Sequence, residues 1–225
     1  MTRILIVDDE PQILRALRIN LQARHYDVIA AADGTQAIAA VEAEHPDVVV
    51  LDLGLPDIDG VQVIRALRAW TPVPVIVLSG RRSSTDKIDA LDAGADDYVT
   101  KPFDINELLA RLRAVTRRRG TTGEPARVRS GRNTVDLATF DAQRDDGERR
   151  HLTRTEWRLL ELLVRNPGRL VGHAELLQHV WGPTYVNEVH YLRQFVAQLR
   201  RKLEDDPARP RHLLTEPGMG YRFQP

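Results

Sequence analysis

The chain has 225 residues, with 32 basic and 32 acidic side chains and no cysteine. This length allows two domains of ordinary size, and the lack of cysteine excludes disulfides and thiolate metal sites. Up to Arg113 the chain has 12 basic and 18 acidic residues, whereas from Ala114 onward it has 20 and 14. The basic half favours a polyanionic partner, although two solvated surfaces would give the same counts. Since no apolar run is long enough to cross a bilayer, we expect a cytoplasmic protein without a membrane partner.

Five short apolar runs alternate with helical patterns in the first half of the chain. The runs are continuous, which is typical of strands covered on both faces of a parallel sheet. They are Arg3–Val7, Val28–Ala32, Val48–Leu51, Val73–Leu78 and Tyr98–Val99. Helices are expected at Pro11–Arg24, Gly34–Glu44, Gly60–Trp70, Ser84–Ala93 and Asp104–Arg118. Five strand–helix repeats predict an α/β fold with a doubly wound, five-stranded parallel sheet.

Polar residues follow the ends of four of these strands, where ligands bind in doubly wound sheets. They comprise three carboxylates, a hydroxyl and an ammonium group: Asp8, Asp9, Asp52, Ser79 and Lys101. A lone Asp after a strand is more often only a helix cap. Together these residues predict a Mg²⁺ site, because crowded carboxylates need a cation and oxygen ligands without His or Cys suit this ion. Such a site can accept a phosphoryl group on a carboxylate, with Lys101 and Ser79 contacting the phosphoryl oxygens.

The motifs that contain these residues resemble the receiver domain of response regulators over about Arg3–Arg118. The resemblance implies a flavodoxin-like strand order of 2-1-3-4-5 and phosphorylation of Asp52 by a sensor histidine kinase. It implies Mg²⁺ bound by Asp9, Asp52 and the backbone carbonyl of Gly54, with Asp8 assisting through water. It further implies that Lys101 contacts the phosphoryl group and that the Lys101–Pro102 bond is cis. The motifs are Asp8-Asp9, Asp52–Pro56, Ser79-Gly80 and Ala95–Phe103.

The same resemblance implies a switch and a dimer interface. Ser79 moves toward the phosphoryl group and Tyr98 turns into the vacated space, which changes the surface of helix 84–93, strand 98–99 and helix 104–118. Charges on this surface resemble those of a homodimer that forms on activation. The expected pairs are Lys87–Glu107, Asp97–Arg111 and Asp96–Arg118. Exposed pairs add little energy singly, so their role would be to select partner and register.

A connector at 119–127 is expected to separate a receiver domain at 1–118 from a second domain at 128–225, because it lacks apolar periodicity and contains Gly and Pro. Val128–His151 predicts a small antiparallel sheet. Thr153 and Glu156 have the spacing of a capping box, and the helix that they open ends at Pro167-Gly168. A second helix is expected at His173–Trp181.

The third helix of this half, Asn187–Glu204, has an apolar stripe and a polar, basic face. The basic face fits the major groove of DNA, although such a face alone is commonly just solvated. Pro210–Gln224 predicts a hairpin, so this half is expected to be a winged helix-turn-helix domain. The candidate DNA-binding residues of the helix are His190, Arg193, Gln194, Arg200 and Arg201.

The second half resembles the effector domain of the OmpR/PhoB subfamily over about Val128–Phe223. The resemblance implies binding of promoter duplex DNA and contact with RNA polymerase through 182–187. Many members carry an arginine near the wing tip, where Pro217 stands here. We therefore expect wing contacts from Thr215 and Arg222, with minor-groove readout in doubt. Several stretches, His190–Arg193 and Glu204–His212 among them, are similar to regulators of potassium-uptake (kdp) genes, whose partner is a KdpD-like kinase.

Two other functions stay open, although we expect no enzyme. A phosphatase of the haloacid-dehalogenase type also uses an aspartyl phosphate and Mg²⁺. That family needs a second Asp two residues after its nucleophile, and Glu10 stands there when Asp8 is the nucleophile. A phosphorylation-dependent adaptor would use the face of Arg193 and Arg200 to bind protein. Phosphorylation-dependent binding to duplex DNA separates a transcription regulator from both.

Overall fold

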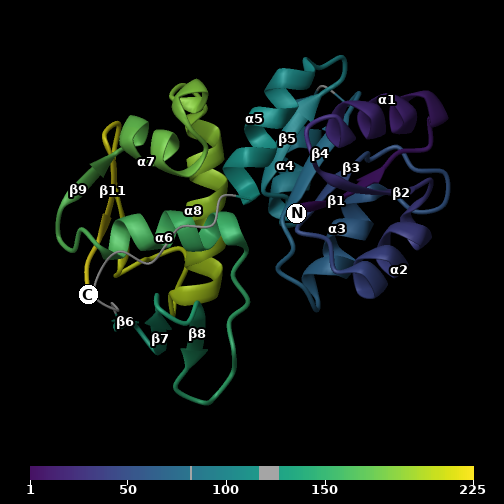
Figure 1. Ribbon diagram of the computed structural model, residues 1–225. Coiled ribbons are helices and arrows are strands. Elements are labelled where there is room, and N and C mark those ends of the chain that lie inside the picture. Colours follow the sequence, from purple (N-terminus) through teal and green to yellow (C-terminus); the bar gives the residue numbers. More distant parts are fainter. Residues whose placement is uncertain (82, 117–126) are drawn as a thin grey trace. The chain divides into compact units, whose positions relative to one another are not determined.

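The computed structural model describes residues 1–81, 83–116 and 127–225. The chain divides into two compact units, Met1–Arg117 and Arg118–Pro225, each with its own core (Figure 1). The expected connector at 119–127 lies outside the described residues except for Arg127, which begins a strand. The domain boundaries remain a prediction. Within the described ranges, none of the helices is long and apolar enough to span a membrane.

The first unit is a five-stranded parallel sheet in the order β2-β1-β3-β4-β5, which confirms the predicted fold class. Its strands are β1 (Arg3–Val7), β2 (Asp27–Ala31), β3 (Val48–Leu51), β4 (Val75–Ser79) and β5 (Asp97–Thr100). Its helices are α1 (Pro11–Gln22), α2 (Gly34–Glu44), α3 (Gly60–Arg68), α4 (Ser84–Asp92) and α5 (Ile105–Thr116).

Helices cover both faces of this sheet, which is why its strands read as continuous apolar runs (Figure 1). Leu17 of α1 and Leu112 of α5 pack in one cluster with alternate strand residues such as Ile4 and Val50. On the other face α2 contacts β1 and α3, and α3 contacts α4. The central strands are almost completely buried, so the polar residues that follow them are held on a rigid framework.

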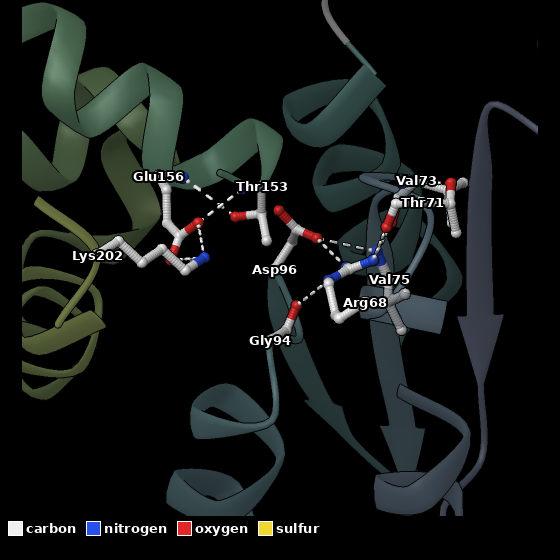
Figure 2. A network of polar contacts seen from close by, with 9 residues as sticks. All are labelled: Arg68, Thr71, Val73, Val75, Gly94, Asp96, Thr153, Glu156 and Lys202. Atoms are coloured by element: carbon white, nitrogen blue, oxygen red, sulfur yellow. Dashed lines mark hydrogen bonds and ion pairs between the residues drawn. The ribbon is translucent and has the colours of Figure 1, made fainter. Parts of the chain in front are cut away.

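One charged side chain ties α3 to the amino ends of β4 and β5. Arg68 donates to the carbonyl oxygens of Val73 at 2.7 Å and Gly94 at 2.9 Å, and it pairs with buried Asp96 at 3.0 Å (Figure 2). The same Asp96 oxygen accepts from the backbone N–H of Val75 at 3.0 Å. Both Val73 and Pro74, predicted to lie in the strand, precede β4, which begins at Val75.

Over its described residues, 127–225, the second unit combines three α-helices with two small antiparallel sheets, as expected for a winged helix-turn-helix domain. One sheet has the order β6-β7-β8 and the other β10-β11-β9. The strands are β6 (Arg127–Ser130), β7 (Asn133–Asp136), β8 (Asp141–Arg144), β9 (Leu170–Gly172), β10 (Leu213–Glu216) and β11 (Gly220–Phe223). The helices are α6 (Arg154–Val164), α7 (His173–Val180) and α8 (Val189–Leu203), with a 3₁₀ turn at Pro183–Tyr185.

The predicted capping box opens α6, and it also anchors α8. The Thr153 hydroxyl accepts from the backbone N–H of Glu156, and the Glu156 carboxylate accepts from the N–H of Thr153. The Lys202 ammonium group donates to both oxygens of buried Glu156 at 2.7 and 2.6 Å (Figure 2). This pair fixes the carboxyl end of α8 to the amino end of α6. The strand β9 was not expected, because its three residues are too few for a clear pattern in the sequence.

We expect Arg68→Ala to destabilise the first unit by about 3 kcal/mol, since it leaves buried Asp96 without its cation. The measurement is hydrogen exchange by mass spectrometry on peptides from β4 and β5, with α8 peptides as the internal reference. Arg65→Ala, at an exposed position of the same helix, is the matched control and should change stability by less than about 0.5 kcal/mol. Equal exchange in both variants would rule out this role of Arg68.

Candidate phosphorylation site and nucleic-acid interface

Three strands of the first unit end at one charged cluster. Asp8 follows β1, Asp52 follows β3 and Lys101 follows β5. The Lys101 ammonium group lies 2.7 Å from Asp8 Oδ2 and 2.7 Å from Asp52 Oδ2. The two carboxylates are largely buried, at 2% and 7% exposed. The strand ends therefore bring together the residues that the sequence placed at this edge, because parallel strands carry their carboxyl ends to the same side of the sheet.

A third carboxylate completes a group of oxygen donors. Asp8, Asp9 and Asp52 each offer one oxygen, and these oxygens lie within 4.8 Å of one another. The backbone of Gly54 borders the same carboxylate, since a Cβ at this glycine would lie 4.0 Å from Asp52 Oδ2. A set made only of oxygen ligands fits Mg²⁺, which takes carboxylates and carbonyls and keeps several waters. The donor chemistry thus agrees with the predicted ion.

Burial and charge act against each other in this cluster. Burial raises the pKa of Asp8 above its ordinary value, and the hydrogen bond from Lys101 only partly opposes this. Burial alone would lower the pKa of Lys101, but its hydrogen bonds to Asp52 and Asp8 raise the pKa overall. The lysine therefore stays charged and partly neutralises a crowded group of carboxylates.

The loop between β3 and α3 is anchored by two carboxylates that the sequence analysis did not single out. Asp57 accepts from the backbone N–H groups of Gly34 and Thr35, each at 2.8 Å, and from the Thr35 hydroxyl at 2.7 Å. The hydrogen bonds from Thr35 and Gly34 hold the pKa of Asp57 well below its ordinary range. Asp59 caps α3 through Val61. An Asp just before Gly60 was the available signal for this cap.

The two residues of the predicted switch lie beside each other. Burial raises the pKa of the Tyr98 phenol, and the nearby Ser79 hydroxyl partly opposes this. The Tyr98 hydroxyl donates to the backbone carbonyl of Arg81 at 2.7 Å. Lys87 lies over the Tyr98 ring, with its ammonium nitrogen 5.9 Å from the ring centroid. Tyr98 thus points inward, and Arg81, which the sequence analysis left out, supplies its acceptor.

Charges expected at a dimer interface have partners within one chain. Arg111 pairs with Asp97 at 2.9 Å and with Glu107 one helical turn away. Asp96, which was expected to pair with Arg118, is buried and accepts from Arg68 and from the N–H of Val75. Its expected pair with Arg118 stays a prediction. Arg118 lies outside the described residues.

The third helix of the second unit presents two exposed arginines, Arg193 and Arg201. Gln194 and His190 are partly exposed, and His190 lies 3.2 Å from the Glu188 carboxylate. The opposite side of α8, including Leu192, Phe195 and Leu199, is buried in the domain core. The amphipathic pattern read from the sequence is therefore a division between core and surface, and the exposed side keeps the residue types that contact DNA.

Three of the predicted DNA-binding residues also join parts of the domain to one another. Arg200 donates to the carbonyl of Leu213 at 2.9 Å and to the Thr215 hydroxyl at 2.7 Å, which ties α8 to β10. Arg222 donates to the Gly168 carbonyl and pairs with Glu216, at 3.0 and 2.9 Å. Arg200, Thr215 and Arg222 thus hold the wing in place, because the hairpin brings acceptors within reach of the two arginines. Their part in DNA binding stays a prediction.

The turn of the wing joins β10 to β11. It spans 217–219, with Gly218 at a φ of +74° and Met219 exposed. The position before Gly218 is Pro217, whose ring carries no charge. Within this described turn there is no arginine to enter the minor groove.

Comparison with known proteins decides the family. Residues 4–113 match the response regulator receiver domain, and residues 147–223 match the C-terminal domain of transcriptional regulatory proteins. The chain belongs to the OmpR/PhoB-type response regulators. It is 59% identical to the transcriptional regulatory protein KdpE of Mycobacterium tuberculosis over the full length of both chains. It is also 50% identical to the KDP operon transcriptional regulatory protein KdpE of Escherichia coli, over 99% of each chain.

A solved response regulator has the same order of domains. The crystal structure of DrrB, an OmpR/PhoB homologue from Thermotoga maritima, matches all of this chain and all of its own, with 32% identity and a TM-score of 0.53. Two-domain response regulators of this type combine a receiver with a DNA-binding domain, and the cis Lys101–Pro102 bond of this chain agrees with the implied receiver geometry. The chain is thus a two-component response regulator, similar to KdpE.

Asp8→Asn should stabilise the first unit by on the order of 1 kcal/mol at neutral pH in EDTA, since it removes a buried charge from crowded carboxylates. Because the pKa of Asp8 is raised, the Asp8 carboxylate of the wild-type protein takes up a proton and loses its charge as the pH is lowered. The difference should therefore shrink as the pH falls through that raised pKa toward the ordinary value of 3.8. This difference in stability is measured by urea unfolding at several pH values, monitored by hydrogen exchange of β1. A variant that is less stable than the wild type at neutral pH would contradict this account.

Proposed function

We propose that the protein is a phosphorylation-controlled transcription regulator in which Asp52 accepts a phosphoryl group from a cognate histidine kinase. The observation that carries the proposal is the position of the Lys101 ammonium group, 2.7 Å from both Asp8 and Asp52, beside a third carboxylate from Asp9. A lysine at this position can neutralise a phosphoryl oxygen once Asp52 carries the group.

The residues around Asp52 divide the work of the transfer. Asp9, Asp52 and the carbonyl of Gly54 would hold Mg²⁺, with Asp8 assisting through water. A bound Mg²⁺ supplies positive charge for the phosphoryl oxygens. Lys101 orients the second of these oxygens, and the Ser79 hydroxyl donates to the third. Asp52 is the nucleophile, and the backbone N–H of Leu53, 2.6 Å from Asp52 Oδ1, orients its carboxylate.

Phosphorylation then becomes a change at the surface of α4, β5 and α5. A dianionic group at Asp52 attracts the Ser79 hydroxyl, which frees space that inward Tyr98 fills. We propose that this surface forms a symmetric dimer. The candidates for the interface stay Lys87, Asp96, Asp97, Glu107, Arg111 and Arg118. Arg111 would exchange an internal partner for one across the two-fold axis. Exposed ion pairs of this kind select register rather than supply affinity.

The dimer would place two effector domains on promoter DNA. Arg193, Gln194 and Arg201 are the candidates for contacts in the major groove, together with His190. Arg200, Thr215 and Arg222 support the wing. Residues 182–187, which precede α8, are the candidate contact with RNA polymerase. Action on promoter DNA implies work in the cytoplasm.

We propose potassium-uptake genes as the target and a KdpD-like sensor kinase as the phosphoryl donor. The support is the full-length similarity to two proteins named KdpE, one of which is described as a regulator of the KDP operon. The names of these relatives describe transcription regulators, which favours this function over a phosphatase or an adaptor. Under this proposal the chemistry at Asp52 serves signalling, and the protein does not turn over an external substrate.

We expect Mg²⁺ and acetyl phosphate to add one phosphoryl group to the wild-type protein and none to Asp52→Asn. Intact-mass spectrometry measures the addition. With beryllofluoride in place of acetyl phosphate, sedimentation should show conversion of wild-type monomer to dimer, and Asp52→Asn should not respond. Phosphorylation of the Asp52→Asn protein would reassign the acceptor. A wild-type protein that binds beryllofluoride and stays monomeric would contradict the dimer.

Arg193→Ala should weaken binding to the operator by about 1–3 kcal/mol if its guanidinium makes a good base contact. Its affinity for random duplex should fall much less, which fluorescence anisotropy at fixed salt can measure. Arg149→Ala removes another exposed arginine of the same unit and is the control for charge alone. Equal losses for operator and random duplex would end the assignment of Arg193 to base readout.

Arg200→Ala separates support from readout. Because Arg200 joins α8 to β10, its loss should lower the melting temperature of the effector domain along with DNA affinity, whereas Arg193→Ala should leave the melting temperature unchanged. If Arg200→Ala alters DNA affinity alone, the structural role given to it here is wrong.

A further inference from the structure

Arg81 lies between β4 and α4 and contacts the loop on the other side of the phosphorylation site. Its guanidinium Nη2 lies 2.6 Å from Asp59 Oδ2 and 3.3 Å from the carbonyl oxygen of Leu53. Leu53 directly follows the phosphoacceptor Asp52, and Asp59 caps α3 with its other oxygen. The side chain therefore bridges the segment after β4 and the segment after β3.

The backbone of the same residue contacts both members of the switch. The N–H of Arg81 donates to the Ser79 hydroxyl at 3.3 Å, and its carbonyl accepts from the Tyr98 hydroxyl at 2.7 Å. The position of this carbonyl depends on the contacts that anchor Arg81. The side chain of Arg81 is anchored by its contacts with Asp59 and Leu53.

We propose that Arg81 is a positioning residue of the switch. The ion pair with Asp59 holds the Arg81 carbonyl where inward Tyr98 needs its acceptor, and so links the loop that carries Gly54 to the tyrosine. We call the contacts of Arg81 with Asp59 and Leu53 the Arg81 strap. The Arg81 strap favours the inward position of Tyr98, so loss of the strap should raise the concentration of beryllofluoride that the switch needs. The proposal rests on phosphorylation at Asp52.

An alternative role for Arg81 predicts a different pattern of variants. If the guanidinium instead served the phosphoryl group directly, release from Asp59 would leave it free to do so, and Asp59→Asn would not impair the switch. If the Arg81 strap positions Tyr98, Asp59→Asn and Arg81→Gln both impair the switch, because each removes the same ion pair. Asn at position 59 still offers an oxygen to cap α3, which separates the ion pair from the cap.

The experiment follows Tyr98 in the full chain by ¹⁹F NMR of 3-fluorotyrosine. The chain has five tyrosines, and the signal of Tyr98 is assigned from its loss in Tyr98→Phe. Beryllofluoride is titrated in the presence of Mg²⁺, and the concentration at half-response is recorded. We expect Asp59→Asn and Arg81→Gln each to raise it by about two- to fivefold, the range that a half-exposed ion pair can supply.

Three further variants sharpen the result. The double variant should match the single ones, since two partners of one pair do not act additively. Arg81→Lys keeps the charge and should recover most of the wild-type response. Asp27→Asn breaks the pair of Arg3 and Asp27, which has nearly the same length, 2.7 Å, and exposure, 41% and 43%, against 38% for each partner of the strap. It should leave the half-response unchanged.

Each result has one meaning. An unchanged or lowered half-response in Asp59→Asn would overturn the strap, whatever Arg81→Gln does. Additive losses in the double variant, or an equal effect of Asp27→Asn, would overturn it as well. A wild-type protein whose Tyr98 signal ignores beryllofluoride would overturn the strap, whereas phosphorylation at Asp52 is decided separately by the mass that acetyl phosphate adds.

Discussion

The cation of Lys101 between Asp8 and Asp52 is the interaction on which the first unit depends. Two largely buried carboxylates would repel each other at this edge of the sheet, and the lysine from β5 offsets that repulsion. The three residues come from strands far apart in the sequence, so the site exists only when β1, β3 and β5 lie parallel in one sheet. The same parallel arrangement of strands therefore forms both the fold and the site.

The loops around the site are held by charges rather than by apolar packing alone. Asp57 binds the amino end of α2, Asp59 caps α3, and Arg81 joins two loops. Such contacts fix the backbone of the loops that surround the cluster of Asp8, Asp52 and Lys101. Loops fixed at their ends can pass a local change of charge to a distant surface as a discrete movement.

Charged residues of the effector domain divide into two kinds. Lys202 and Glu156 fix one end of the recognition helix, and Arg200 fixes it to the wing. These contacts orient the helix, so that Arg193 and Arg201 are presented on its outer side. An arginine that supports the helix and an arginine that is exposed on its outer side have the same side chain and similar spacing, so the sequence alone does not separate them.

The sequence by itself determined the α/β fold class, the charged cluster at the strand ends and the capping box of α6, because these follow from local periodicity and from the spacing of short motifs. The strand order came from the resemblance to receiver domains. It could not decide which partner each charge takes. Only the tertiary structure brought Asp96 to Arg68 and Arg200 to Leu213, across 28 and 13 residues of chain. Long polar side chains reach any acceptor within a few ångströms, and that distance is set by how distant segments pack, not by the residues beside them in the chain.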